Sequence, residues 1–415
     1  MSLTSKLTGV VFYGFNKKLR WDKIFMWRQI QDETGRNVTK FPNNIFFRSL
    51  IRKRNVTLNV QHNPFIGYIN SGRESCINAF DTFCGLGQFD KVYQSPKKYV
   101  FCNLDWFWLV FKYIPSWRET LKPINLTPSQ KREIIVDLIN FWYLQTSIGT
   151  LKFTKYRLFV AFFDANPESA FLREMFRVHQ VPTATLQHGQ FVGYREDVLE
   201  NSGIEFRCFN SDHFLVWNKF TIDEAIKHGI DLERMTLCGI LGYIGTKRKK
   251  CSAPQNNTFG VVLGHPVLGK EENLILIQAA NILARERNLK YFLKLHPNYA
   301  ENFFDNMADS KYYVGNIQKG IPMMEYASMV DFSIIGGSSV FVELIYMGHD
   351  TIRFSNNDVK DKFRDIKIGK IFHHPDEIVA VYDEHKGKDF TNELFDYLCS
   401  VDDVTAAYKK FLSKF

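Results

Sequence analysis

Apolar runs and amphipathic stretches alternate along most of the chain, most clearly after residue 151. Short apolar runs rich in β-branched and aromatic residues predict strands, and apolar residues at helical spacing predict helices. The predicted strands are 157–163, 183–186, 213–217, 259–263, 289–295, 330–335 and 351–354, and the predicted helices are 168–180, 221–228, 271–286 and 340–346. The strand–helix–strand order implies parallel sheets with right-handed crossovers.

A polar stretch, 246–257, separates two such α/β halves and contains four consecutive basic residues. We interpret it as a linker between domains. A chain of 415 residues is long enough for two domains, each with its own core. The predicted fold class is therefore α/β, with two Rossmann-like domains, 1–245 and 258–415, that face each other across a cleft. The last helix can pack back on the first domain.

The pattern before residue 151 is weaker. It predicts strands at 10–13 and 57–60, and helices at 21–34 and 128–145. The stretch 68–80 is predicted as a loop followed by a helix. The helix at 128–145 carries an apolar stripe, which we interpret as core packing. Helix 271–286 carries apolar residues at Leu274, Ile277, Ala280 and Ala284.

The segment Lys294-Leu-His296-Pro297 ends one predicted strand of the second half. Proline cannot donate in a sheet ladder, so the strand stops there and the histidine lies at its carboxyl edge. Ligands bind at this edge in open α/β sheets. A histidine in that place can donate to a phosphate. Gly264 and His265 follow another strand of the same half.

A Gly-Gly-Ser-Ser turn follows the strand 330–335 and leads into a short helix. Ser338 or Ser339 can cap that helix. The turn with Gly337 offers backbone N–H groups to a phosphate. Glu343 lies one turn further along the helix, on the same side, where a carboxylate can accept hydrogen bonds from a ribose diol. The second half thus has the outline of a nucleotide site.

The first half places two candidate side chains at neighbouring strand ends. Asp164 follows the strand 157–163, and His188 follows the strand 183–186. Gly189 lets the backbone turn sharply after the histidine. Either side chain could act as a base at a ligand edge, although aspartate is also favoured in turns.

Composition narrows the function classes. The chain is 45% hydrophobic and 23% charged, with a net charge of +9. The positive excess suits an anionic substrate or an anionic membrane surface, although a merely basic surface explains it equally well. No motif indicates nucleic-acid binding. The seven cysteines include no C-x-x-C pair, so neither a zinc site nor a disulfide framework is indicated.

The first residues contain no apolar run followed by a cleavage site, so we expect no signal peptide. The most apolar run, 100–114, is interrupted by Asp105 and Lys112. That run is too short and too polar to cross a bilayer. We expect a cytoplasmic protein that can touch the inner face of a membrane through basic and aromatic residues.

Three motifs together carry a family resemblance: Leu186-Gln-His188-Gly189, Lys294-Leu-His296-Pro297, and Gly337-Ser-Ser339 with Glu343. The set resembles glycosyltransferases of the GT-B fold that build bacterial capsules and other surface polymers. The His-Pro and paired serines are similar to those of sialyltransferases, polysialyltransferases and Kdo transferases, which use CMP-sugars. The resemblance covers about residues 157–354.

The resemblance implies a role for each residue. His296 would bind the donor phosphate, with Ser338 and Ser339 beside it, and Glu343 would hold the donor ribose. His188 would act near the acceptor, a surface oligosaccharide or lipid-linked glycan. The acidic pair followed by glycine that marks the base in several sialyltransferases is missing, so Asp164 stays a rival base. No D-x-D motif follows a strand, so we expect metal-independent transfer with no cofactor beyond the nucleotide-sugar substrate.

Three other functions stay open at this point. The motifs also resemble CDP-glycerol and CDP-ribitol phosphotransferases. Gly264-His265, Glu272-Asn273 and the Gly-Gly-Ser turn are loosely similar to UDP-N-acetylhexosamine 2-epimerases, although the first loop of those enzymes has no match here. A non-catalytic partner in glycan assembly would bind a nucleotide without turning over a donor.

Overall fold

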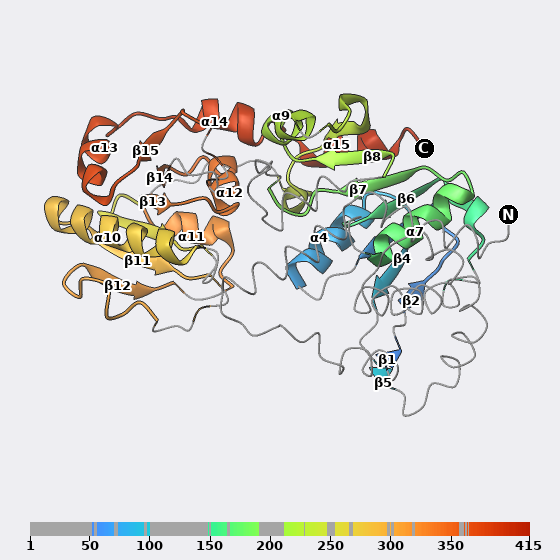
Figure 1. The fold of residues 1–415 in the computed structure, drawn as a ribbon, viewed down its shortest axis with the longest axis horizontal. Helices are drawn as coiled ribbons and strands as arrows, with labels where there is room; N and C mark the ends of the chain where they lie inside the picture. The colour runs from blue at the N-terminus through green and yellow to red at the C-terminus, as the bar shows by residue number, and fades with distance from the viewer. Residues whose placement is uncertain are drawn as a thin grey trace, which may run out of the picture.

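The computed structural model describes most of the two α/β halves. The described residues are 52–53, 56–69, 74–94, 98–99, 148, 151–163, 167–190, 211–227, 229–246, 254–264, 269–296, 299, 303–317, 320–356, 361, 363 and 365–415. The predicted elements 10–13, 21–34 and 128–145 lie outside them, as does most of the predicted linker. Figure 1 shows one α/β domain on each side, with the C-terminal one at the left.

Within the described residues, the N-terminal sheet has seven strands. In spatial order they are β2 (Val56–Asn59), β4 (Phe89–Gln94), β3 (Phe65–Ile69), β6 (Leu158–Ala161), β7 (Thr183–Leu186), β8 (His213–Val216) and β9 (Met235–Leu237). Only β2 runs antiparallel to its neighbour. The central strands are buried along their whole length, as expected of a parallel sheet covered on both faces. The predicted β-α-β unit of β6 and β7 is confirmed.

Strand β3 corrects the sequence prediction, which treated the start of 68–80 as a loop. Residues Phe65–Ile69 form a fully buried strand, and helix α4 (Glu74–Cys84) follows. The misleading signal is Gly67, a residue that usually weakens strands. A Cβ at this position would lie 2.6 Å from the ring of Phe80 on α4. The glycine therefore lets the helix pack closely on the strand.

The C-terminal sheet has six strands, all parallel. Their spatial order is β12 (Tyr313–Asn316), β11 (Lys290–Lys294), β10 (Thr258–Val262), β13 (Phe332–Ile335), β14 (Thr351–Phe354) and β15 (Lys370–Phe372). Counted along the chain, this is the order 3-2-1-4-5-6 of a Rossmann sheet. From β10 the chain adds β11 and β12 on one side of the strand, and then returns to add β13, β14 and β15 on the other side. The gap between β10 and β13 is therefore the topological switch point, where ligands bind in such sheets.

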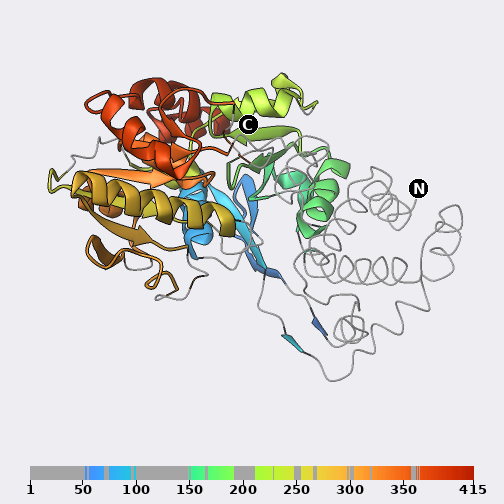
Figure 2. The ribbon, with the colours of Figure 1, turned by 60° about the vertical axis from the view of Figure 1, so that its left-hand side comes forward.

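Helix α10 (Lys270–Arg287) lies along one face of this sheet, as Figure 2 shows. Its buried side chains include Leu276, Ile277 and Leu283, but Leu274 is 39% exposed. Of the apolar residues noted in this helix, Leu274 therefore lies off the buried face. The helix also packs against α13 (Ile378–Glu384), which turns the buried face away from that residue.

The other described helices are α7 (Pro167–Val178), α9 (Lys219–Lys227), α11 (Met323–Met329), α12 (Val340–Tyr346), α14 (Thr391–Leu398) and α15 (Val404–Leu412). The last helix returns to the first domain, where α15 lies beside β8 in Figure 1. The hydroxyl of Tyr408 donates to the carbonyl of Gly239 at 3.1 Å, and its ring packs edge-on against Phe83. The rings of Tyr243 and Tyr346 stack at 3.9 Å, which joins the two domains a second time.

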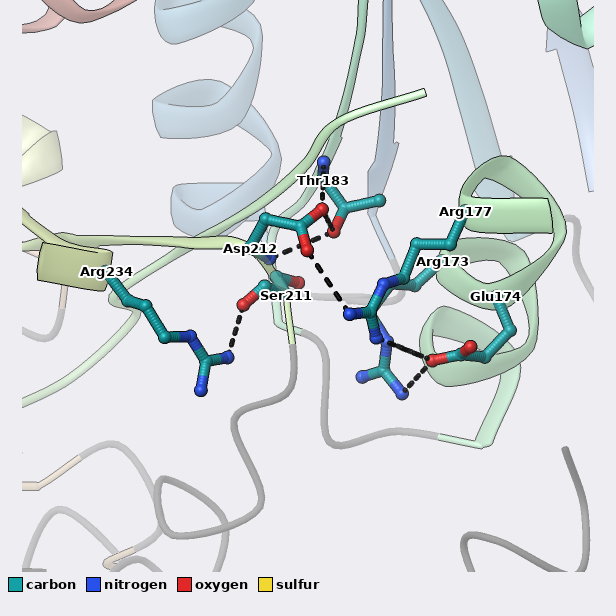
Figure 3. Close-up of polar contacts among 7 residues, drawn as sticks. All are labelled: Arg173, Glu174, Arg177, Thr183, Ser211, Asp212 and Arg234. Atoms are coloured by element: carbon teal, nitrogen blue, oxygen red, sulfur yellow. Dashed lines mark hydrogen bonds and ion pairs between the residues drawn. The ribbon is translucent and has the colours of Figure 1, made fainter. Parts of the chain in front are cut away.

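A polar cluster fixes the amino-terminal ends of β7 and β8 (Figure 3). Asp212 accepts hydrogen bonds from the backbone and hydroxyl of Thr183, at 2.9 and 2.8 Å. It also pairs with Arg177, which pairs in turn with Glu174. These contacts tie helix α7 to the sheet edge opposite the carboxyl ends, so we interpret the cluster as structural.

No helix in the described part of the chain is long and apolar enough to cross a membrane.

Buried polar contacts hold helix α11 against the centre of the C-terminal sheet. The hydroxyl of Tyr326 lies 2.9 Å from the hydroxyl of Ser333, which lies 2.9 Å from Nε2 of His349. All three side chains are buried. Gly260 on β10 makes room for this chain of contacts, because a Cβ there would overlap the tyrosine hydroxyl.

We predict that Gly260→Ala destabilises the fold by about 1–3 kcal/mol, the usual cost of forcing extra volume into a packed core. Gly242→Ala is the matched control, because a Cβ there would meet no atom within 4 Å. Urea unfolding of both variants measures the difference. Equal free energies of unfolding for Gly260→Ala and the wild type would contradict the packing described for Tyr326.

Candidate functional site

Asn273 holds the chain immediately after β10. Its Oδ1 accepts from the backbone N–H of Gly264 at 2.7 Å, and its Nδ2 donates to the carbonyl of the same glycine at 3.2 Å. Nδ2 also donates to the hydroxyl of Tyr299 at 2.8 Å. Asn273 is fully buried, so these bonds fix the loop where the switch point begins. His265, the next residue predicted for the site, lies outside the described residues.

Lys294 is the last residue of β11, at the carboxyl edge of the sheet. Its ammonium group is close to a backbone carbonyl and an aromatic ring. Nζ donates to the carbonyl of Ile321 at 3.4 Å and lies 5.4 Å from the ring centroid of Tyr326. Burial lowers the pKa of Lys294, and the negative charge of Glu343 opposes that shift. The lysine is thus a partly desolvated cation at the predicted ligand edge.

Glu343, on α12, is the matching acid. Burial raises its pKa from 4.5 to about 7, and Lys294 acts in the opposite direction. Burial raises the pKa of Tyr243, a residue of the N-terminal domain, and the negative charge of Glu343 raises it further. Lys294 and Glu343 are thus near enough for each charge to act on the pKa of the other, but no ion pair within 4 Å joins them.

The backbone N–H of the Gly336-Gly337 turn, predicted to be open to a phosphate, already has a partner in the protein. The backbone N–H of Gly337 donates to Oε1 of Glu272 at 3.1 Å, and a Cβ on Gly336 would overlap that carboxylate. A glutamate from α10 therefore lies against the turn where the sequence predicted a phosphate. A glycine is required at position 336 because the carboxylate would overlap a Cβ there.

The serines after the turn only partly follow the prediction. Helix α12 begins after Ser339, as expected, but no side-chain hydrogen bond from Ser339 caps it. The hydroxyl of Ser338 instead accepts from the backbone N–H of Val340 at 3.4 Å. Both serines are half-buried at the start of the helix.

His296 lies two residues after the end of β11 and is half-buried. Its carbonyl accepts from the backbone N–H of Tyr299 at 3.0 Å, which bends the chain after the strand. The predicted break at this strand end is confirmed, because β11 ends at Lys294. Pro297 lies outside the described residues.

His188 lies at the carboxyl end of β7, in the other sheet. Its ring packs against that of Phe163, with 4.2 Å between the centroids. The neighbouring Gln187 accepts from the backbone N–H of Trp217 at 2.7 Å and donates to the carbonyl of Gly189 at 2.8 Å. These bonds hold the loop that carries His188. Asp164, the rival base, lies outside the described residues.

A second amide reinforces this loop. Gln190 is buried, and its Oε1 accepts from Nδ2 of Asn218 at 3.1 Å. The same Nδ2 donates to the carbonyl of Leu398 at 2.6 Å, at the end of α14. The loop of His188 is thus linked to the chain returning from the C-terminal domain.

The described residues contain no group of three or more His, Cys, Asp or Glu side chains that could hold a metal ion.

Sequence comparison adds nothing to this site, since neither the protein-family models nor the curated proteins contain a match to the chain.

Solved structures match the chain over most of its length. The UDP-GlcNAc 2-epimerase of Methanocaldococcus jannaschii is 10% identical, with a TM-score of 0.51, over 85% of this chain and 99% of its own. A putative UDP-N-acetylglucosamine 2-epimerase of Listeria monocytogenes is 11% identical, with a TM-score of 0.51, over 84% and 95%. The glycotransferase of kitacinnamycin is 11% identical, with a TM-score of 0.51, over 85% and 99%.

The chain has the GT-B fold. The predicted fold class is thereby confirmed. At such low identities the likeness extends to the arrangement of the two Rossmann-like domains only.

Two residues of this site did not stand out in the sequence. Glu272 and Asn273 lie in the first turn of α10. In the sequence, only a loose similarity to 2-epimerases indicates a role for them. Acidic residues are common in the first turn of a helix, so Glu272 carries no local signal. Its contact with Gly337 joins residues 65 positions apart.

We predict that Glu343→Gln changes how stability depends on pH. Below about pH 4.5 the wild-type carboxyl is protonated in both the folded and unfolded states. As the pH rises toward 7, only the unfolded chain ionises, so the folded state loses stability through this group. The variant lacks that loss, and its advantage should grow by about 1–3 kcal/mol across this range and then level off.

Unfolding free energies measured from pH 4 to 8 test this prediction. Glu325→Gln, at an exposed position on α11, is the control and should run parallel to the wild type. A curve for Glu343→Gln that is also parallel to the wild type would show that burial does not perturb Glu343.

Proposed function

We propose that this protein is a nucleotide-sugar enzyme whose C-terminal domain binds the nucleotide of the donor. The observation that carries the proposal is that two partly desolvated groups of opposite charge, Lys294 and Glu343, act on each other at the carboxyl edge of a GT-B fold. Ligands bind at this edge of Rossmann sheets. A cation can bind a phosphate, and a carboxyl group can accept hydrogen bonds from hydroxyl groups. The two groups together therefore suit a molecule that carries both phosphate and hydroxyl groups.

Each group has a chemical task in the proposed complex. Lys294 supplies positive charge to the donor phosphate, whose own charge would offset the cost of burying the ammonium. Glu343 accepts hydrogen bonds from the ribose hydroxyls. His296, at the end of the same strand as Lys294, is the proposed third contact to the phosphate.

Glu272 imposes a condition on donor binding. Its carboxylate accepts from the N–H of Gly337, which is also a donor that a phosphate could use. Two anions cannot share that N–H without strong repulsion. A donor phosphate therefore either displaces Glu272 or binds on the Lys294 side of the turn.

The proposed reaction is glycosyl transfer from a CMP-sugar to a surface-glycan acceptor. The leaving nucleotide phosphate is stabilised by Lys294 and neighbouring donors, so the step needs no metal ion. His188, held at the end of β7 in the other domain, takes the proton from the acceptor hydroxyl. Histidine can do this near neutral pH without a large pKa shift.

Epimerisation of a UDP-N-acetylhexosamine is the second candidate. Two observations favour it: several solved structures of this fold are described as UDP-GlcNAc 2-epimerases, and Glu272 and Asn273 lie against the Gly-Gly turn and Gly264. Loss and return of the C2 proton needs an acid–base residue at that carbon, and Glu272 or Glu343 could supply it.

A melting-temperature screen with CMP, CDP, UDP and GDP tests nucleotide binding, because a ligand that binds only the folded state stabilises it. We predict that a cytidine nucleotide gives the largest shift and that EDTA does not reduce it. Lys294→Ala should lose most of the shift, whereas the exposed Glu325→Gln should retain it. No shift with any of the four nucleotides would refute the proposal.

The two reactions differ in where hydrogen goes. Epimerisation in D₂O places deuterium at C2 of UDP-GlcNAc and needs no acceptor. Transfer releases free nucleotide from a donor sugar only as the acceptor is consumed. A UDP preference together with deuterium uptake would replace the transferase with the epimerase.

We predict that His188→Ala slows turnover about 10²–10⁴-fold, the usual cost of losing a general base, while nucleotide affinity stays unchanged. Asp164→Asn is the matched comparison, since the sequence predicts Asp164 as the rival base at the end of the neighbouring strand. Calorimetry measures the affinity, and initial rates measure the turnover. Loss of activity in Asp164→Asn alone would reverse the roles of these two residues.

A further inference from the structure

Helix α9 carries contacts from the N-terminal domain to the C-terminal domain. It lies beside α14, as Figure 1 shows. The ring of Phe220 packs against those of Tyr397 and Phe363, with 5.8 Å between the centroids in each pair. The hydroxyl of Tyr397 donates to Asp223 at 2.9 Å. The first turns of α9 are therefore fixed to residues of the C-terminal domain.

Asn218 precedes α9 and uses its whole amide group. Its Oδ1 accepts from the backbone N–H of Thr221 at 2.8 Å, a bond that caps the helix. Its Nδ2 donates to the carbonyl of Leu398 at 2.6 Å and to Oε1 of Gln190 at 3.1 Å. The side chain is fully buried, and these bonds use its oxygen and both of its N–H groups. Asn218 thus joins the start of α9, the loop of His188 and the end of α14.

Thr221 holds the loop of His188 at both ends. Its buried hydroxyl accepts from Nε2 of Gln187 at 3.1 Å and from Nε2 of Gln190 at 3.2 Å. The two glutamines flank His188 and Gly189 in the sequence. One hydroxyl on the first turn of α9 therefore fixes the short loop that carries the histidine.

These four side chains form a buried amide and hydroxyl network at the carboxyl ends of β7 and β8. A buried amide that loses its partner costs free energy, so a network of this kind holds one arrangement. The contacts of Asp212 already fix the amino-terminal ends of the same two strands. Holding these strands in place does not require a bond to Leu398 of the other domain. The extension of the network to that carbonyl therefore indicates a role in joining His188 to the C-terminal domain.

We infer that Thr221 and Asn218 are positioning residues for His188, the general base of the proposed function, on which this inference rests. Thr221 holds the loop against α9, and Asn218 holds both the loop and α9 against α14. The place of His188 relative to the candidate nucleotide site then depends on how the two domains are joined. A reacting group misplaced by about 1 Å can lower a rate about 10²-fold.

Four substitutions separate this role from packing and from general contact between the domains. Thr221→Val removes the hydroxyl at nearly constant shape, and Thr221→Ser retains it. Asn218→Ser keeps an oxygen that can cap α9 but loses both N–H donors. Tyr397→Phe is the matched control, because it breaks an exposed hydrogen bond between the same two helices, outside the network.

Two measurements are made on the full chain, after urea unfolding has shown that each variant is fully folded. The first is the NMR signal of the His188 ring in histidine-labelled protein, assigned by its loss in His188→Ala. The second is steady-state kinetics with the donor. We expect Thr221→Val and Asn218→Ser to shift or broaden the His188 signal and to lower kcat about 10²-fold. KM for the donor should stay unchanged, and Thr221→Ser and Tyr397→Phe should keep wild-type values in both measurements.

A wild-type His188 signal in both Thr221→Val and Asn218→Ser overturns the inference. Equal losses in Thr221→Ser and Thr221→Val also overturn it, because the packing of the methyl group and not the hydroxyl would then be responsible. If His188→Ala keeps full turnover, the base of the proposed function is wrong, and the NMR signal alone decides the positioning. Gln190→Leu removes only one of the bonds to Thr221, so it keeps the test decisive if the other variants fail to fold.

Discussion

The parallel pairing of β10 with β13 is the constraint on which the rest of the site depends. Val262 pairs with Ile335, so Gly264 and the Gly336-Gly337 turn leave the sheet side by side. Helix α10 starts from the first of these exits, and its first turn reaches both: Asn273 holds Gly264, and Glu272 holds Gly337. The crossover order of the sheet thus places one helix across two loops.

The charges at this edge depend on one another. Glu343 is held partly protonated by burial, while Lys294 favours its ionised form. Glu272 occupies the adjacent turn, and its negative charge also acts on the buried Arg353. A phosphate entering this edge meets a cation, a neutralisable acid and a competing carboxylate. The balance of charge among these three groups decides whether the edge mainly binds phosphate or mainly transfers a proton. Phosphate binding is what glycosyl transfer needs, and proton transfer at the sugar is what epimerisation needs in addition.

The two domains are connected at several points besides the linker. The stacked rings of Tyr243 and Tyr346 join the first domain to α12, the helix that carries Glu343. Asn218 joins the loop of His188 to the end of α14. The candidate groups of each domain therefore lie on segments that also carry interdomain contacts. A shift of one domain relative to the other would move these groups together with their supports.

The sequence by itself determined most of the alternating strands and helices between residues 157 and 354, because local apolar periodicity and turn residues report directly on burial, but it did not predict β9, β12, α11 or β15. It also placed Lys294, His296 and Glu343 at strand and helix ends of one edge. It failed at β3, since Gly67 gives a loop signal that only the packing of Phe80 explains. Only the tertiary structure decided that Glu272 lies on the Gly-Gly turn and that Glu343 is desolvated, because both depend on residues distant in the chain.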